Sequence, residues 1–548
     1  MIDRSLCIEA FFMESYFLKQ YTIDNLKEIL SDHDYSASHL IEDKTHLIYF
    51  NDYFSDLGVG AQTMIVENRY IDRDYLEDFS GYYIRCFEDY ERSCRRIHFF
   101  DQRITDDEFK EYIKGKTTDE LQDAYIGFVT VRPLPKTIIG RTCLSTYKDD
   151  DRRKYPATRT YSVNLFGLSL KVDNTLAFQE QDRVASACAT SALWSVFQAT
   201  GKLFEHSIPS PVVITESATK QIPLDSRSLP NNGLTAEQMA YAVREVGLEP
   251  LSISARGNTG LLKAQLYAYL KSGIPLIMII DLYETKALPS LSRFGNERHA
   301  VAVTGFSLGT PIPIQYSQHS KLLLKSSRID KLYVHDDQVG PFARMEFKNV
   351  NVKQRDLTGE DTNEEIPLTV LDSSLRDVEG SVGDIFTIWD TVYVPLYHKI
   401  RIPFQSVLLN AIYIDGFINE ILTKNKFLNL ADRLVWDVYL ITVNDLKNEI
   451  RENSILHEDK RIELLLTNFP KYIWRASSYS GDNQVLDLLF DATDIEQGSY
   501  FERPILYNDD VEIVMTAACE GINISSLSKK IPDSVIGIID WFKNNKTK

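Results

Sequence analysis

The chain has 548 residues and an acidic balance, because 78 Asp and Glu side chains against 60 Lys and Arg give a formal net charge of −18. A hydrophobic fraction of 44% and a charged fraction of 25% are typical of folded protein and exclude a largely disordered chain. The negative charge disfavours direct binding to nucleic-acid phosphates, and no segment approaches the roughly 20 apolar residues that span a bilayer. We therefore expect several folded domains and no direct nucleic-acid or membrane partner.

The N-terminal sequence and the cysteines favour a cytoplasmic protein. Glu9 and Glu14 interrupt the first apolar stretch, which therefore lacks the pattern of a secretory signal. The six cysteines form no Cys-x-x-Cys pair, which argues against a disulfide scaffold and against a zinc ribbon. They are Cys7, Cys86, Cys94, Cys143, Cys188 and Cys519. The sequence has no glycine-rich phosphate loop, so we expect neither a cofactor nor a metal.

The first part of the chain mixes helical and strand-like patterns. Residues 23–30 have helical spacing, and residues 124–133 form a strand-like run that Pro133 ends. Between them, residues 70–100 are dense in Tyr, Arg and Phe, which anchor interfaces but also pack one domain against another. The pattern leaves open whether this region binds a regulatory protein partner or packs against the rest of the chain.

The middle of the chain contains a candidate nucleophile and its base. Cys188 opens an apolar, Ala-rich stretch that we expect to be helical, and a helix start raises the thiolate fraction of a cysteine. Residues 299–306 alternate in side-chain character and stop at Gly305, which predicts a strand that begins at His299. A lone cysteine among alanines is more often a buried hydrophobe than a nucleophile, so the interpretation depends on its partners.

A third group is needed to fix the tautomer of the histidine. The strand-like run at residues 331–335 ends in Asp336 and Asp337, of which we favour Asp336, and the choice between the two stays open. Two aspartates after a strand are also an ordinary turn, and His335 beside them would suit a metal site. Residues 274–280, the longest strongly apolar run, predict a buried strand.

These residues resemble the papain-like cysteine peptidases. The resemblance covers residues 175–345 and rests on the order Gln, Cys, His, Asp, a Trp shortly after the Cys, and a His-Ala-Val strand that ends in Gly-aromatic. Residues 232–235 (Asn-Gly-Leu-Thr), 246–248 (Val-Gly-Leu) and 271–275 (Lys-Ser-Gly-Ile-Pro) are most similar to the bacterial branch that includes the bacteriocin-processing, double-glycine peptidases. The resemblance implies an α+β core in which Cys188, His299 and Asp336 form a catalytic triad.

The chain departs from the family pattern before the nucleophile. Papain-like enzymes place a Gln six residues before the Cys, where its amide helps to hold the oxyanion, and this position is Asp182 here. A negative side chain at the oxyanion would oppose the reaction. We therefore favour Gln181 as the oxyanion residue, with Gln179 as the alternative. The interval from His299 to Asp336 is long, and residues 311–327 are expected to form an inserted loop beside the site.

The last third of the chain is expected to be a mixed α/β region. Residues 348–365 are rich in charge and predict a loop or domain boundary. The run at 387–395 and the run at 434–443 are strand-like, and 444–451 follows as a helix. Helical spacing also marks residues 406–422 and the terminal segment 534–545.

The sequence thus predicts an α+β protein with a papain-like core at 171–346, flanked by accessory α/β domains at 1–170 and 347–548. We expect a cytoplasmic thiol peptidase that cleaves a peptide or isopeptide bond, with hydrolysis preferred over acyl transfer or deamidation by the same dyad. An inactive papain-like recognition module is the alternative, motivated by Asp182. In a third interpretation, the accessory domains sense a signal and release the peptidase, as a regulated effector in a bacterial defence or toxin system.

Overall fold

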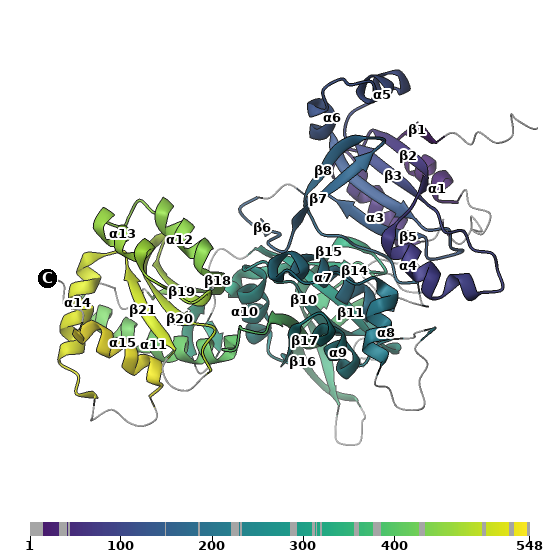
Figure 1. Ribbon diagram of the computed structural model, residues 1–548. Coiled ribbons are helices and arrows are strands. Elements are labelled where there is room, and N and C mark those ends of the chain that lie inside the picture. Colours follow the sequence, from purple (N-terminus) through teal and green to yellow (C-terminus); the bar gives the residue numbers. More distant parts are fainter. Residues whose placement is uncertain are drawn as a thin grey trace, which may run out of the picture. The chain divides into compact units, whose positions relative to one another are not determined.

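The structure is a computed structural model in which the chain forms two compact units, each assembled from separate segments (Figure 1). Unit 1 comprises Met1–Ser254, Ile274–Gly305 and Lys331–Pro395, and unit 2 comprises Ala255–Gly273, Phe306–Asp330 and Leu396–Lys548. The sequence predicted three consecutive domains, whereas the units interleave along the chain. The residues that the structure describes are 15–31, 41, 44–147, 150–182, 184, 187–220, 229–230, 233–284, 293–309, 313, 315–317, 320–355, 361–375, 385–426, 433–495, 500–524 and 531–544.

Unit 1 begins with an antiparallel sheet in the order β1-β2-β3-β4-β5. We call this sheet with its helices α1, α3 and α4 the N-terminal module. Strand β4 of this sheet is buried along its whole length, because apolar side chains from both of its faces enter core clusters. The elements are β1 (Tyr16–Gln20), α1 (Ile23–Ser31), α3 (Thr45–Phe54), β2 (Thr63–Tyr70), α4 (Arg73–Gly81), η2 (Tyr83–Arg85), β3 (Cys94–Phe100), α5 (Asp106–Ile113), α6 (Asp119–Asp123), β4 (Tyr125–Val131) and β5 (Ile139–Leu144).

The second sheet of unit 1 follows the order β10-β11-β14-β15-β16-β17-β9, with an additional pairing between β10 and β17. The hydrogen-bonded path therefore returns to β10 and closes a ring. The remaining elements of this part are β6 (Arg153–Lys154), β7 (Arg159–Leu165), β8 (Leu168–Thr175), α7 (Cys188–Phe204), α8 (Pro211–Thr219), α9 (Ala236–Glu245), β9 (Leu248–Ser254), β10 (Leu276–Glu284), β11 (Arg293–Leu308), β14 (Ile329–Asp336), β15 (Gly340–Arg355), β16 (Asp361–Asp372) and β17 (Ile385–Tyr397).

Helix α7 packs against this sheet and is buried on nearly all sides from Ala189 to Thr200. Its sequence is rich in Ala and in large apolar residues, and the fully buried Trp194 lies near its middle. The Trp194 indole N–H donates a hydrogen bond of 3.0 Å to Asp74 of α4. Because a buried indole N–H needs a partner, this bond ties α7 to the N-terminal module.

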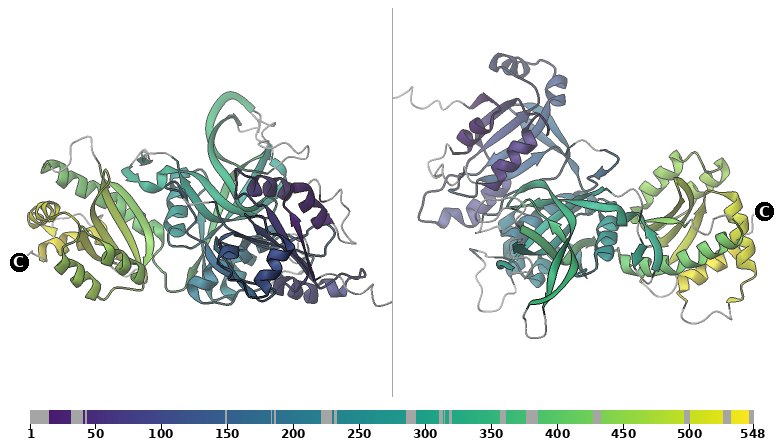
Figure 2. Two further views of the ribbon diagram at one scale, coloured as in Figure 1. Left: turned by 90° about the horizontal axis from the view of Figure 1, so that it is seen from above. Right: turned by 180° about the vertical axis from the view of Figure 1, so that it is seen from behind.

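Strands β15 and β16 form a long antiparallel hairpin that extends beyond the rest of the sheet (Figure 2). Strands β15 and β16 cover residues 348–355 and 361–365, where the charge-rich sequence predicted a loop or boundary. The prediction is wrong for these residues, and residues 356–360 lie outside the described part of the chain. A charge-rich sequence is compatible with a strand here, because the side chains of residues 348–351 and 365–369 are exposed or half-buried.

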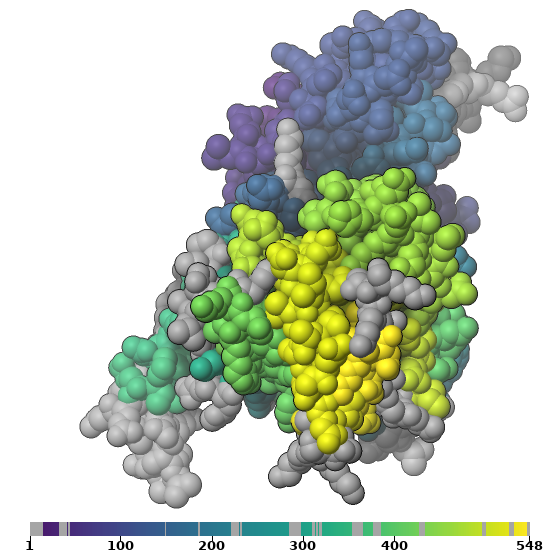
Figure 3. Space-filling model, turned by 90° about the vertical axis from the view of Figure 1, so that its left-hand side faces the viewer, coloured from purple at the N-terminus to yellow at the C-terminus, as the bar shows by residue number. Residues whose placement is uncertain are grey.

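Unit 2 is built around a six-stranded sheet in the order β12-β13-β18-β19-β20-β21, in which β13 and β18 are parallel. Its C-terminal helices form the yellow surface in Figure 3. The elements are α10 (Thr259–Leu270), β12 (Gln315–Ser317), β13 (Ser320–Leu324), η4 (Lys325–Arg328), α11 (Phe404–Lys424), β18 (Val435–Thr442), α12 (Val443–Glu452), α13 (Glu458–Leu466), β19 (Tyr472–Ser480), β20 (Asn483–Asp491), β21 (Phe501–Leu506), α14 (Asp509–Glu520) and α15 (Asp533–Asn544).

The mixture of helices and strands confirms the α+β class. The helices predicted at 23–30, 406–422, 444–451 and 534–545, and the strands predicted at 124–133, 274–280, 331–335, 387–395 and 434–443, are all present with small changes in their ends. The inserted loop predicted at 311–327 is wrong for the described residues, because they include β12, β13 and η4, which belong to unit 2. Among the helices that the structure describes, none combines the length and apolar character of a membrane span.

Candidate active site

Cys188 is the first residue of α7, as the sequence predicted. Ala187 before it is extended, with a ψ of 173°, so the chain turns into the helix at the cysteine itself. The first N–H groups of a helix have no partners within the helix and carry partial positive charge, and Cys188 lies at this end of α7. The Cys188 side chain is half-buried and hydrogen-bonds to His299.

His299 lies inside β11, opposite Ile280 of β10. The prediction that the strand begins at His299 was wrong, because pairing with β10 continues to Arg293. Its Nε2 atom is 2.9 Å from Oδ1 of Asp336, the last residue of β14, and both side chains are buried. Two strands of one sheet therefore hold the imidazole and the carboxylate in register.

The environment of His299 favours its charged form. Burial, the largest effect, would lower the pKa of the imidazole, but the charge and hydrogen bond of Asp336, the bond to Cys188 and the charge of Asp337 together hold it well above 6.5. His299 is therefore an imidazolium at neutral pH. A cation that touches both a thiol and a carboxylate can stabilise a thiolate and later return a proton.

Asp337 lies behind this pair. Its side chain is buried, Oδ1 is 3.5 Å from Nε2 of His299, and neither carboxylate oxygen has a hydrogen-bond partner among the described residues. Burial raises the pKa of Asp337 to about 7, and the charges of Asp336 and Glu180 add to this effect while His299 opposes it. Asp336 also accepts a 3.0 Å bond from the Gln338 N–H, so it is the better oriented of the two carboxylates.

A cation site is the alternative use of these three groups. Ligand atoms of His299, Asp336 and Asp337 lie within 4.8 Å of one another. However, Nε2 of His299 is already engaged by Asp336. His335 does not complete the set, because its ring packs between Phe178 and Phe342 and its Nδ1 atom lies 3.4 Å from the Ser195 hydroxyl. We therefore assign the aspartates to positioning the imidazole.

The structure separates the residues proposed for the oxyanion. Gln179 is buried, and its amide nitrogen has no hydrogen-bond partner among the described residues. It lines a narrow hollow together with Cys188, Ser191, Ser195, Asp337 and neighbouring side chains, and the hollow is too tight for a water molecule. Gln181 is half-buried and does not line this hollow.

Asp182 points elsewhere. Its carboxylate accepts a 3.0 Å bond from the Tyr83 hydroxyl and a 2.8 Å bond from the Val184 N–H. Arg132 is close enough for its pKa to be raised by Asp182. The side chain at the family's glutamine position therefore belongs to a buried polar network of the N-terminal module.

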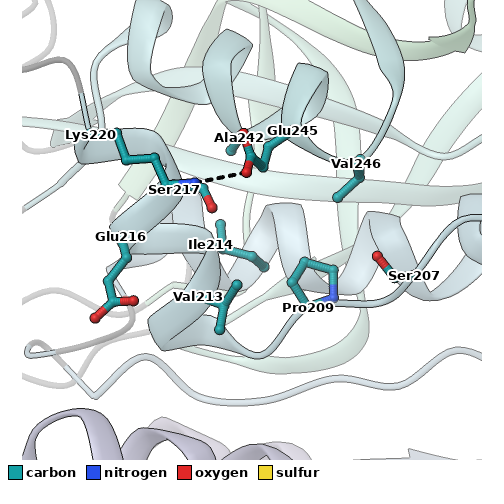
Figure 4. Close-up of a pocket in the computed structure, with 10 residues that line it drawn as sticks. All are labelled: Ser207, Pro209, Val213, Ile214, Glu216, Ser217, Lys220, Ala242, Glu245 and Val246. Atoms are coloured by element: carbon teal, nitrogen blue, oxygen red, sulfur yellow. Dashed lines mark hydrogen bonds and ion pairs between the residues drawn. The ribbon is translucent and has the colours of Figure 1, made fainter.

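A larger hollow of about 290 Å³ lies between α8 and α9 (Figure 4). Its floor is apolar and includes Pro209, Val213 and Ile214, and an ion pair between Lys220 and Glu245 spans its rim at 2.7 Å. No member of the triad lines it, so we do not place the chemistry there.

No protein-family model matches the chain, and a search of curated proteins found no significant match. Among the predicted site residues, the structure brings together Cys188, His299 and Asp336 and leaves Gln181 outside the hollow. Lys44 and His46, which lie behind the site, were not found from the sequence, since no local pattern links them to residues more than a hundred positions away.

Proposed function

We propose that the chain is a papain-like thiol hydrolase that cleaves a peptide or isopeptide bond with Cys188 as nucleophile. The observation that carries the proposal is the connected series from a half-buried cysteine at a helix start, through a buried histidine, to a buried carboxylate at the end of the neighbouring strand. A helix packed against an antiparallel sheet and the chain order Cys, His, Asp also support a papain-like core.

In the proposed reaction, the Cys188 thiolate, whose proton is held by the His299 imidazolium, attacks the carbonyl carbon. The resulting oxyanion receives hydrogen bonds from the Cys188 backbone N–H and the Gln179 side-chain amide. Imidazolium then protonates the leaving amine, and a thioester forms. Water, activated by His299, attacks the thioester and releases the acid and the thiol. We assign the amide donor to Gln179 rather than to Gln181, because the buried Gln179 amide nitrogen has no hydrogen-bond partner among the described residues and its side chain lines the same hollow as Cys188.

The same series of groups also serves acyl transfer to an amine and deamidation, which differ only in the nucleophile or leaving group. The inactive recognition module remains the competing interpretation. That interpretation depended on a carboxylate of Asp182 facing the oxyanion. The Asp182 carboxylate instead accepts a hydrogen bond from the Tyr83 hydroxyl, so this argument against catalysis no longer applies. The interpretations are separated by the reactivity of the thiol.

The decisive experiment is mass-spectrometric mapping of a limiting dose of iodoacetamide in the full chain. Cys86 is an internal control, because it is also half-buried and its sulfur donates to the backbone oxygen of Tyr82 at 3.9 Å instead of contacting an imidazole among the described residues. We expect Cys188 to be modified first, at least tenfold faster than Cys86. This difference should disappear in His299→Ala. It should persist in His457→Ala, the control variant, because His457 is an exposed histidine in unit 2. Equal labelling of both cysteines in the wild type would reject the hydrolase.

A peptide aldehyde tests the oxyanion assignment, because the hemithioacetal that it forms with a cysteine carries an oxygen in the oxyanion position. Gln179→Ala is expected to weaken aldehyde binding by about 10²-fold, the usual effect of one oxyanion donor, and to leave the iodoacetamide rate unchanged. Gln181→Ala is the matched control. The assignment is wrong if the control weakens the aldehyde and Gln179→Ala does not.

A further inference from the structure

We propose that helix α3 of the N-terminal module positions both sides of the active site, with Lys44 and His46 as positioning residues. One side is the Asp336–Asp337 turn that orients His299, and the other is the segment that carries Gln179. The inference rests on the proposed function, and it makes the N-terminal module part of the catalytic machinery instead of a separable accessory domain.

His46 holds the aspartate turn. Its Nε2 atom is 3.1 Å from the backbone oxygen of Asp337, 291 residues further along the chain, and the ring is buried. Burial lowers the pKa of His46 to about 4, while Glu180 and Asp336 oppose this effect and Lys44 adds to it. The ring is therefore neutral at neutral pH. Because a carbonyl can only accept, the proton must lie on Nε2, and His46 donates.

Tyr49 lies three residues after His46 on α3. It contacts the other end of the turn that begins at Asp336 and Asp337. Its hydroxyl donates to the backbone oxygen of Pro341. Helix α3 and the residues after β14 approach so closely here that a Cβ on Gly340 would lie 2.6 Å from the Tyr49 ring. Contacts at Asp337 and at Pro341 bracket the turn, so a shift of α3 would move Asp336 relative to His299.

Lys44 holds the other side through Glu180, the residue after Gln179. The Lys44 ammonium forms a buried ion pair with one oxygen of the Glu180 carboxylate and donates a 2.7 Å bond to the backbone oxygen of Lys136. The second carboxylate oxygen accepts a 3.1 Å bond from the Ile139 N–H. The Glu180 backbone is fixed as well, because its oxygen accepts a 3.0 Å bond from Arg132.

These contacts share one origin. Lys44 is the residue that precedes α3, and His46 and Tyr49 lie in its first two turns. A single rigid segment therefore sets the position of the general base's partner and the position of the oxyanion donor. The two sides can be separated experimentally, because iodoacetamide reports on the thiol and the imidazole, whereas a peptide aldehyde also reports on the oxyanion donor.

The test uses the full chain with ¹⁵N-labelled histidine. His46→Ala is expected to lower the NMR titration midpoint of His299 by about one pH unit and the rate of Cys188 alkylation at pH 7 by about tenfold. His46→Gln keeps an N–H donor and should restore both. Lys44→Met is expected to weaken aldehyde binding by about tenfold and to change the iodoacetamide rate by less than twofold. Lys19→Ala, which breaks a surface ion pair with Glu28 in the same module, is the control for unspecific effects.

Amide exchange at residues 336–341 provides a readout that does not depend on catalysis, and it should accelerate in His46→Ala and recover in His46→Gln. If wild-type Cys188 is unreactive, the hydrolase fails while the His299 titration and the amide exchange still test the positioning role. If folded His46→Ala leaves titration and exchange unchanged, the positioning role is wrong even when the hydrolase is right. Should His46→Ala not fold, aldehyde binding by Lys44→Met decides, and unchanged binding in that variant rejects the proposal.

Discussion

Replacing Asp336 with Asn is the most direct test of how the site is charged. The change keeps the size of the side chain and removes one negative charge that lies 2.9 Å from Nε2 of His299. This charge is the largest of the effects that raise the pKa of the imidazole. The variant is therefore expected to lower that pKa and to reduce the fraction of Cys188 that is held as an ion pair with His299.

The size of the effect follows from the distances. An opposite charge within about 4–6 Å shifts a pKa by about 1–3 units. The second carboxylate, on Asp337, stays 3.5 Å from Nε2 and retains part of the field. We therefore expect the lower part of that range, about 1–2 units, which corresponds to about 1.4–2.7 kcal/mol. The rate of Cys188 alkylation at pH 7 should fall by about 10–100-fold.

The assay measures the iodoacetamide rate from pH 5 to pH 9 together with the ¹⁵N titration of His299. Asp337→Asn is the matched control. Asp337 lies farther from Nε2, and its raised pKa of about 7 leaves it only partly ionised at pH 7, so this change should alter the rate less. The reasoning is refuted if Asp336→Asn alters neither the titration nor the rate, or if Asp337→Asn has the larger effect on both.

Three further predictions concern stability. Because the pKa of Asp337 is raised from 3.8 to about 7 in the folded chain, it favours folding below about pH 4, and this contribution is lost as the pH rises to 7. In chemical denaturation between pH 4 and pH 7, the free energy of unfolding of the wild type should therefore fall, relative to that of Asp337→Asn, by up to about 1.4 kcal/mol per pH unit. A difference between the two proteins that does not change with pH would contradict this prediction. In unit 2, Asp437→Ala leaves Lys271 without its 2.8 Å carboxylate partner and should cost about 2–3 kcal/mol in urea unfolding, and no loss would mean that water replaces the pair. Trp194→Phe removes the indole bond to Asp74 and should cost about 1.5–3 kcal/mol, with a neutral result implying that another donor takes its place.

The sequence predicted best the features that depend on neighbouring residues. The helix that begins at Cys188 and the strand that ends at Asp336 follow from apolar periodicity, and both are present. The approach of these two ends could be expected only through the family resemblance. Periodicity defines which residues share a face of one element but carries no information on which elements meet.

The choice between Gln179 and Gln181 shows where such reasoning ends. The polar run 179–182 reads as an exposed loop, yet Gln179, Glu180 and Asp182 are all buried. Glu180 is buried because Lys44 neutralises it, and Asp182 because Tyr83 and Arg132 face it. These partners come from distant parts of the chain, so no local signal distinguished the buried glutamine from its half-buried neighbour.

The interleaving of the two units has a consequence for synthesis. The chain passes between the units five times, and the ring of unit 1 closes only when β17 pairs with β10. Cys188 therefore leaves the ribosome before His299 and Asp336, and at about 5–20 residues per second the wait for Asp336 lasts roughly 7–30 s. In the proposed mechanism, the nascent thiol has no base during this time, so the proposed hydrolysis cannot begin until most of the sequence has emerged.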